Sequence, residues 1–421
     1  MRRHDFPFNT GYPLAEHDEG SMKPSLNRLT PPHILTLVLA TSTGALAMNI
    51  FLPSLPGIAR HFQADYAVVQ LTVSLYLAAM AILQLGIGPA SDRFGRRPVM
   101  ITCFIIFMIG SLGTILAPTI ELLLLARVMQ AFSAAGMVLS RAIVRDMVGP
   151  DEAASKIGYV TMGMAAVPMV APAIGGLLDE AYGWQAAFLV TLGFGAVALL
   201  VVYLDLGETN QNRSSSMFSQ VRSYPVLFRS RRFWGYTSAA AFTSGTFFAF
   251  LGGGPYIATE MLGLRPSQYG LYFALLSLGY MLGNFLSGRY ASRIGINAMI
   301  LTGNIVSTTG VALSLTLFWV GIMHPLSLFG PMALLGIGNG LTLPSANAGI
   351  VSVRPQLAGS ASGLGGAIQI GGGAALSALA SAYLSPESGP FPLIWMMLIS
   401  SSASIAASVY VAYVARQAGE A

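Results

Sequence analysis

Long apolar runs separated by short polar connectors dominate this chain of 421 residues. A helix that crosses the hydrocarbon core of a bilayer needs about 20 mostly apolar residues. Twelve runs reach that length, and the connectors between them carry glycine, proline and charged residues. The pattern therefore predicts an all-α membrane protein with twelve transmembrane helices. The runs cover residues 34–55, 69–90, 98–117, 121–145, 157–179, 184–204, 233–254, 268–290, 298–320, 326–349, 358–384 and 390–414.

The longest internal connector is polar and basic, and it divides the twelve runs into two sets of six. The segments that end the second run of each set match at a shift of 200 residues, so that Arg93 meets Arg293 and Gly95 meets Gly295. Paired halves of this kind are a known transporter architecture. We therefore predict two pseudo-symmetric six-helix halves. The predicted parts are an N-terminal cytoplasmic arm (1–32), the first half (33–205), a central cytoplasmic loop (206–232), the second half (233–415) and a tail (416–421).

The charge distribution predicts the orientation in the membrane. Only 9% of the residues are charged, whereas soluble domains carry roughly 25%. Lysine and arginine gather in the connectors on the same side as the N-terminus, and the opposite side receives only Arg60 and Arg265. Because cytoplasmic loops are enriched in these residues, we predict that both termini are cytoplasmic. The net charge of +5 is then a topology signal, and it does not indicate nucleic-acid binding.

The residues themselves exclude several chemistries. Cys103 is the only cysteine, so there is no internal disulfide. The only lysines, Lys23 and Lys156, lie outside any P-loop frame, and the five histidines lack zinc-ligand spacing. We predict no metal site, no cofactor and no enzyme activity. The first 28 residues lack the apolar core of a signal peptide, and Met22 is an alternative start.

The connector after the second run reads GPASDRFGRR, with one acid among three arginines. It resembles the G-x-x-x-D-R-x-G-R-R/K loop of the major facilitator superfamily, and the matching residues are Gly88, Asp92, Arg93, Gly95, Arg96 and Arg97. Further segments resemble the Bcr/CflA branch of drug exporters: LLLLARVMQAFSAAG, SRAIVRDM, APAIGG and GWQAAF. The resemblance covers nearly the whole chain after Leu35. It implies the major facilitator fold and the export of amphipathic drugs across the bacterial inner membrane by proton antiport. We expect a monomer.

The resemblance also implies that Arg96 pairs with an acid at the cytoplasmic end of the fourth run, where Asp146 lies. We predict a cluster of Asp92, Arg96 and Asp146 that latches the cytoplasmic side while the protein faces outward and that breaks when it opens inward. Asp92 is also expected to accept hydrogen bonds from backbone amides at the start of the third helix, where the helix dipole favours an acid. The simpler alternative is that the arginines of this connector are only positive-inside anchors.

Arg127 lies about seven residues into the fourth run, roughly 10 Å deep at 1.5 Å per residue. A charge at that depth is costly and indicates a functional site; the alternative is a structural hub that donates to backbone carbonyls. Glu121 is the candidate for a second titrating site. The resembling family often carries an acid in its first helix before a Y-L-P segment, and Asn49 of MNIFLP takes that place here. Proton coupling therefore rests on the resemblance.

The fifth run contains Pro168, Pro172, Gly175 and Gly176. Because proline removes an amide donor and kinks a helix, we predict that these residues interrupt the helix and form a gating segment. A cavity with apolar, aromatic and methionine side chains and few polar groups suits amphipathic drugs. The candidates for its lining are Asn49, Tyr76, Met80, Gln130, Phe248, Tyr256, Tyr280, Asn339, Asn347 and Gln369.

Two functions agree with these patterns. The leading hypothesis is a drug exporter driven by proton antiport, which the APAIGG segment favours. The alternative is a facilitator or symporter for a small polar solute on the same fold, which Asn49 in place of the acid keeps open. A membrane-embedded enzyme would need a catalytic cluster, and the sequence contains none.

Overall fold

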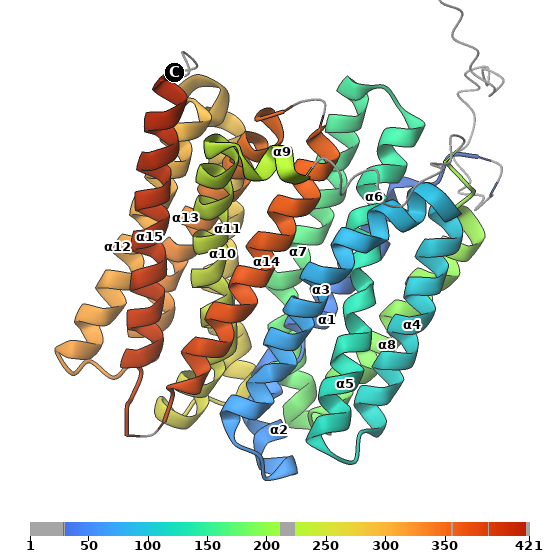
Figure 1. Cartoon of the computed structure of the whole chain (residues 1–421). Helices are drawn as coiled ribbons and strands as arrows, with labels where there is room; N and C mark the ends of the chain where they lie inside the picture. Colours follow the sequence, from blue (N-terminus) through green and yellow to red (C-terminus); the bar gives the residue numbers. More distant parts are fainter. Residues whose placement is uncertain (1–27, 29, 211–223, 355–356, 386, 418–421) are drawn as a thin grey trace, which may run out of the picture.

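The computed structural model describes residues 28, 30–210, 224–354, 357–385 and 387–417. These residues are helical and contain no strand, and the long helices run up and down the molecule (Figure 1). Most of the predicted arm and tail and the middle of the predicted central loop lie outside them. The helices are α1 (Ile34–Asn49), α2 (Leu55–Phe62), α3 (Tyr66–Phe94), α4 (Arg96–Leu116), α5 (Ile120–Gln130), α6 (Ala134–Met147), α7 (Pro150–Tyr182), α8 (Gln185–Asp205), α9 (Tyr224–Phe228), α10 (Arg231–Tyr256), α11 (Pro266–Ile294), α12 (Ile296–Trp319), α13 (Pro325–Ser352), α14 (Ala358–Ala382) and α15 (Phe391–Gln417).

Each of the twelve predicted runs coincides with one long helix or with two consecutive helices, which confirms the predicted fold class. Within the described ranges, eleven of these segments are long and apolar enough to cross a membrane. The twelfth is α10, whose sequence is rich in glycine, serine and threonine. α10 packs against α13, α14 and α15 in the second half. These helices bury most of α10, and only part of its surface, including Trp234 and Phe242, is exposed. The buried part does not meet lipid, so it needs fewer apolar side chains.

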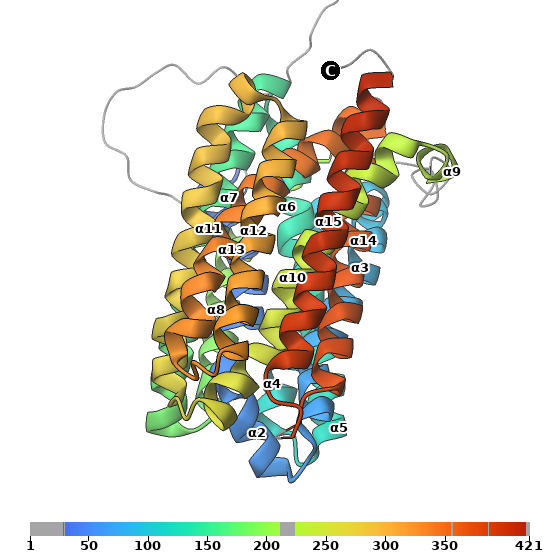
Figure 2. The same cartoon turned by 90° about the vertical axis from the view of Figure 1, so that its left-hand side faces the viewer.

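The two halves, α1–α8 and α10–α15, lie side by side in Figure 1, and the second half stands in front of the first in Figure 2. The predicted repeat is visible in the backbone. Gly95, between α3 and α4, has φ 103° and ψ 151°, and Gly295, between α11 and α12, has φ 89° and ψ 151°. A positive φ is unfavourable for residues with a Cβ, whereas glycine adopts it readily. The same turn in both halves therefore requires the glycine that the two segments share.

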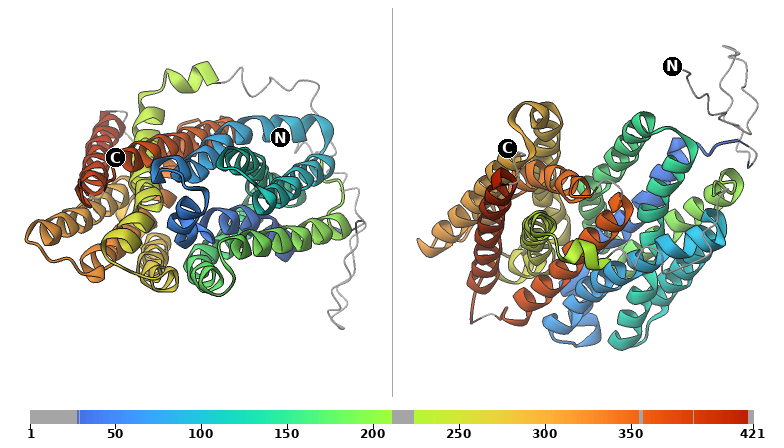
Figure 3. Two further views of the ribbon diagram at one scale, coloured as in Figure 1. Left: turned by 90° about the horizontal axis from the view of Figure 1, so that it is seen from below. Right: turned by 45° about the horizontal axis from the view of Figure 1, so that its top comes forward.

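α1 begins and α15 ends at the same end of the molecule, the upper end in Figure 1. We name it the terminal end, and the opposite end the far end. Polar contacts between the halves gather toward the far end, where Arg60 Nη1 donates to Glu260 Oε1 at 2.8 Å. The Glu180 carboxylate accepts from the Ser267 amide at 3.0 Å and from its hydroxyl at 2.6 Å. The halves meet mainly through α3 with α14 and α7 with α11. Figure 3 shows the molecule from below on its left and with the top tilted toward the viewer on its right. The far end is closed.

Two spans that the sequence predicted as continuous contain breaks. The first span breaks after Asn49 and continues through a 3-10 turn, Leu52–Ser54, into α2. The fourth span has a 3-10 turn at Ala131–Ser133 between α5 and α6. Conversely, α7 is continuous through both of its prolines. The prediction that prolines interrupt the fifth span is therefore wrong, because neighbouring helices can satisfy the backbone groups that a proline leaves free.

Candidate functional site

Arg96, in the first turn of α4, is the centre of a polar cluster at the terminal end. Its Nη1 donates to Asp92 and to Ser91 Oγ at 2.6 Å, and its Nε donates to Asp146 Oδ2 at 2.9 Å. Ser91 in turn donates to the carbonyl of Gly88 at 2.7 Å. Arg96 is only 8% exposed, so these acceptors replace the water that a charged group needs. The structure brings together the three residues that were predicted to interact, from α3, α4 and α6.

Among the described residues, the side chain of Arg96 bonds to acceptors on α3 and α6, so the cluster lies within the first half. The hypothesis that it latches the cytoplasmic side while the protein faces outward, and breaks when the protein opens inward, stays a prediction. Because α3, α4 and α6 pack on one another within one half, a movement between the halves does not have to separate them.

Glu208, in the segment after α8, caps the start of α4. Its carboxylate accepts from the amides of Arg96 at 2.9 Å and Arg97 at 3.4 Å. A Cβ added to Gly95 would overlap this carboxylate. Asp92 was expected to accept from the amides at the start of this helix, and its carboxylate binds the side chain of Arg96. A carboxylate near a helix N-terminus is favoured whichever segment carries it, and no spacing in the sequence indicates that residue 208 returns to residue 96.

The two outer arginines of the motif have different surroundings. Arg93 is exposed, as expected for a membrane-surface anchor. Arg97 donates to the carbonyls of Leu206 at 2.8 Å and Tyr203 at 3.2 Å, at the end of α8. A cation is favoured at a helix C-terminus, so Arg97 fastens α8 to the turn before α4.

Arg127 on α5 is a fully buried charge in the first half. Its Nε donates to the carbonyl of Thr72 at 3.0 Å, and its Nη1 donates to the carbonyl of Ala47 at 3.0 Å and to Gln130 Oε1 at 2.6 Å. The guanidinium carbon lies 4.4 Å from the ring centroid of Tyr76, within the range of a cation–π contact. Arg127 therefore connects the first, second and fourth spans in the manner of a hydrogen-bond hub.

Glu121 does not share this buried site. It is exposed in the first turn of α5, where Thr119 Oγ1 accepts from the amide of Leu122 at 3.4 Å. A carboxylate is favoured there by the helix dipole. The prediction of a second buried titrating group at Glu121 is wrong, and among the described residues the hydrogen-bond acceptors of Arg127 include no carboxylate.

The prolines of α7 create a contact between the halves. Pro172 has no amide hydrogen, so the carbonyl of Pro168, four residues earlier, lacks its usual helical donor. Ser277 on α11 donates its hydroxyl to this carbonyl at 3.2 Å. The lost helical hydrogen bond is thus replaced by one that crosses from the first half to the second.

The glycines of α7 allow backbone to approach backbone. A Cβ added to Gly175 would overlap the carbonyl of Ile50, at the break in the first span. A Cβ added to Gly176 would overlap the carbonyl of Pro266, at the start of α11. The segment from Pro168 to Gly176 therefore contacts both the first span and the other half of the molecule.

Within the described ranges, no group of three His, Cys, Asp or Glu side chains could hold a metal ion. The model of the Major Facilitator Superfamily matches residues 37–377. The chain belongs to the major facilitator superfamily. It is a multi-pass membrane transporter.

Its relatives confirm the resemblance to the Bcr/CflA branch of this superfamily. An uncharacterized MFS-type transporter of Bacillus subtilis, YdgK, is 32% identical over 340 residues, covering 78% of this chain and 83% of YdgK. The bicyclomycin resistance protein homolog of Haemophilus influenzae is 28% identical over 397 residues, covering 90% of this chain and 95% of that protein. A solved structure of a bacterial homologue of the human lysosomal transporter Spinster has a TM-score of 0.68 at 18% identity, over 91% of this chain and 96% of that one. This structural likeness shows the fold.

Transporters of this superfamily bind substrates near the bilayer midplane between the halves, and the ten cavity candidates differ in how they could reach such a site. Tyr76, Met80 and Gln130 are buried in the first half and contact protein. The Tyr76 hydroxyl, for example, donates to the carbonyl of Gly44 at 3.0 Å. Tyr76 and Met80 lie on α3, which packs on α14 of the second half, and Ile370 of α14 packs against their cluster.

The remaining candidates have free or partly exposed groups. Asn49 and Asn339 are buried, and the side-chain oxygen of each lacks a hydrogen-bond partner. Gln369 donates to Ser244 Oγ at 2.7 Å within the second half. Phe248, Tyr256, Tyr280 and Gln369 are partly buried, whereas Asn347 is exposed. The unsatisfied amide oxygens are the polar groups that a substrate or a water molecule would most readily satisfy.

Proposed function

We propose that the chain is a secondary active transporter that exports amphipathic drugs by proton antiport and alternating access. The observation that carries the proposal is the segment of α7 from Pro168 to Gly176, which packs backbone against backbone on the other half. Small residues and replaceable hydrogen bonds suit a contact between helices that must re-form in each cycle. The relative named for bicyclomycin resistance supports an antibiotic-like substrate.

The proposed location is the bacterial inner membrane, with the terminal end in the cytoplasm. Arg93 and Arg145 lie in the last turns of α3 and α6 and Arg229 precedes α10, all at that end, whereas Arg60 near the end of α2 and Arg265 before α11 lie at the far end. The bias in basic residues supports this orientation, and the bacterial relatives support the membrane. We propose a monomer that acts on a small substrate without catalysing a reaction.

The Arg96 cluster is proposed to stiffen the cytoplasmic end of the first half. Asp92, Arg96 and Asp146 join α3, α4 and α6. A half that keeps its own helices together can rock against the other half as one body, which alternating access requires. In this role the cluster supports transport in both the outward-facing and the inward-facing state, whereas the latch hypothesis gives it a role only in the outward-facing state.

Proton coupling has one observation against it, which favours the second candidate function. Asn49 takes the place of the acid in the resembling family, and its Oδ1 is buried without a partner. In the same helix, the carbonyl of Ala47 accepts a hydrogen bond from Arg127. A neutral amide at Asn49 suits hydrogen bonding to a polar solute, and it cannot exchange a proton at physiological pH.

Proton release from everted membrane vesicles tests the proposal. Vesicles that contain the protein are acid-loaded by respiration, and phenicols and bicyclomycin are added. We expect dequenching of a pH-sensitive dye that vesicles without the protein do not show. Drug accumulation without proton movement would contradict antiport and establish the facilitator.

The variant Asn49→Asp separates the two functions further. In an exporter that uses another proton site, an acid at this buried position should change the substrate affinity and have little effect on the pH dependence of the transport rate. A facilitator should acquire a new pH dependence of transport, because a titratable group then lies at a buried position of the first span. The measurement is transport rate between pH 5.5 and 8.5 for both proteins, and identical pH profiles would exclude a role of this position in proton transfer.

A further inference from the structure

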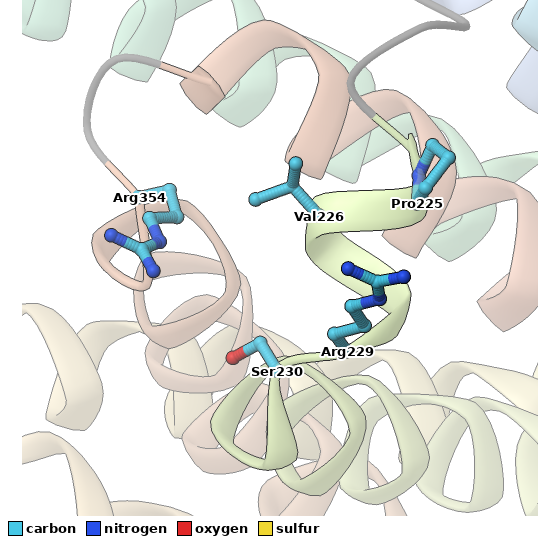
Figure 4. A pocket seen from close by; sticks show the side chains of 5 residues that line it. All are labelled: Pro225, Val226, Arg229, Ser230 and Arg354. Atoms are coloured by element: carbon cyan, nitrogen blue, oxygen red, sulfur yellow. The ribbon is translucent and has the colours of Figure 1, made fainter.

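Two hollows lie near the start of α10, at the terminal end of the second half. The first has a volume of about 350 Å³ and is lined by Pro225, Val226, Arg229, Ser230 and Arg354. Arg229 comes from the end of α9, and Arg354 follows α13; they lie on opposite sides of the hollow (Figure 4). Both arginines are exposed, and neither is in an ion pair within the described ranges. The hollow therefore presents two guanidinium groups to a ligand.

The second hollow begins one helical turn further along α10. It has a volume of about 380 Å³ and is mostly apolar, and its lining residues are Trp234, Gly235, Ser238, Phe242, Ala403, Ala406, Ala407 and Tyr410. They come from α10 and α15, and Trp234, Phe242 and Tyr410 are among the exposed large apolar side chains. Ser230 of the first hollow and Trp234 of the second are four residues apart, so they lie on the same face of the chain.

The charge of the surroundings is of one sign. In the part of the second half that the structure describes, the only acids are Glu260 and Glu387, and both follow the far ends of their helices. Within this described part of the second half, the charged residues at the terminal end are arginines, among them Arg229, Arg289, Arg293 and Arg354. A ligand for the basic hollow must therefore be an anion.

The position of the two hollows defines the ligand more closely. Arg229 precedes α10 and Arg354 follows α13, and residues at the ends of spanning helices are positioned to meet lipid phosphates. Trp234 Nε1 donates to the carbonyl of Phe228 at 2.8 Å, and tryptophan is enriched at the boundary between membrane and water. The apolar hollow extends along α10 from Trp234 to Phe242, away from the terminal end. The pair of hollows matches a molecule with an anionic head and an apolar chain.

We propose that this pair of hollows is a binding site for one anionic phospholipid, with its phosphate between Arg229 and Arg354 and an acyl chain against Trp234 and Ala406. The site is independent of the drug-export pathway, because it lies on the outer face of α10 and α15. It would anchor α9, the described part of the connection between the halves, to the membrane surface.

Retention of lipid by the purified full-length protein tests the proposal. The protein is stripped of lipid, incubated with phosphatidylglycerol or phosphatidylcholine of equal chain length, and analysed by native mass spectrometry. We expect retention of one phosphatidylglycerol over phosphatidylcholine. The double variant Arg229→Gln with Arg354→Gln should bind phosphatidylglycerol about thirtyfold more weakly at low salt. Each basic side chain near an anionic surface increases the affinity about fivefold.

Matched variants control for charge and folding. Arg289→Gln with Arg293→Gln removes the same charge at the same end, outside the hollow, and should retain the lipid. Arg229→Lys with Arg354→Lys should retain most of it, whereas Ala406→Trp fills the apolar hollow and should release it. Equal retention by the Arg229→Gln, Arg354→Gln protein and its control, or full displacement by inorganic phosphate, would overturn the proposal. Full retention by Ala406→Trp would overturn the assignment of the acyl chain.

Discussion

Arg60 on α2 and Glu260 after α10 form an ion pair of 2.8 Å that joins the two halves at the far end. The side chains are 68% and 42% exposed. Exposed ion pairs contribute about 0–1 kcal/mol, because water screens them. The buried packing of α7 on α11 must therefore supply most of the free energy that keeps the far end closed.

The first prediction concerns this ion pair. Glu260→Gln should change the transport rate by less than about fivefold, which corresponds to 1 kcal/mol or less. The measurement is drug efflux from cells that express equal amounts of each protein. A complete loss of transport would show that the pair acts as a gate of its own.

Gly175→Ala is expected to inactivate transport. The added methyl group would overlap the carbonyl of Ile50, and overpacking of this kind costs about 1–3 kcal/mol. Gly158→Ala is the matched control on the same helix, because a Cβ there meets no atom within 4 Å. Equal efflux by the two variants would mean that the first span and α7 separate easily at Gly175.

Arg127→Lys should lower both the melting temperature and the transport rate. Lysine cannot donate to Thr72, Ala47 and Gln130 in the same geometry, and each buried acceptor left without a donor costs about 1–3 kcal/mol. The measurement combines thermal unfolding in detergent with efflux in cells. A protein of unchanged melting temperature that no longer transports would instead identify Arg127 as a coupling residue with little structural role.

Asp92→Asn should reduce transport by about tenfold with expression intact. The amide keeps the size of the side chain but removes the charge that faces Arg96, and a charged hydrogen bond contributes about 1.5–3 kcal/mol before screening. Arg93→Gln, in the next position and exposed, should have little effect on efflux. Normal efflux by Asp92→Asn would reduce the motif to a membrane anchor.

Patterns within single helices predicted much of this molecule. The apolar runs located the spans, and the shift of 200 residues located the turns at Gly95 and Gly295, because both signals depend on local sequence. The pairing of Arg96 with Asp146 came from a family pattern that records contacts between helices. α10 shows where hydropathy is insufficient, since a helix inside the bundle is not selected for contact with lipid.

Other features depend on contacts that no local pattern contains. Glu208 caps α4 from more than 100 residues away, and the sequence pointed to the nearer Asp92 for that position. Glu121 looked buried from its distance to Arg127 along the chain, yet it lies in an exposed first turn. The prolines of α7 were expected to interrupt the helix, but Ser277 of the second half donates to the carbonyl of Pro168 that Pro172 leaves free. The corrections at α4 and α7 follow from partners that are distant in the sequence and that only folding brings near.

The segment after α8 has a consequence for how the chain can be divided. Asp205 accepts from the amide of His33 at 2.8 Å and from Thr36, and Glu208 caps α4, so the chain up to Asn210 is fastened to the first half. On the other side, Ser230 caps α10 by accepting from the amide of Phe233 at 3.3 Å. The hydrogen bonds that hold each end of this connection therefore lie within one half. Two polypeptides divided between Asn210 and Tyr224 and made in the same cell should find each other through α3–α14 and α7–α11, and assemble as a transporter of two subunits.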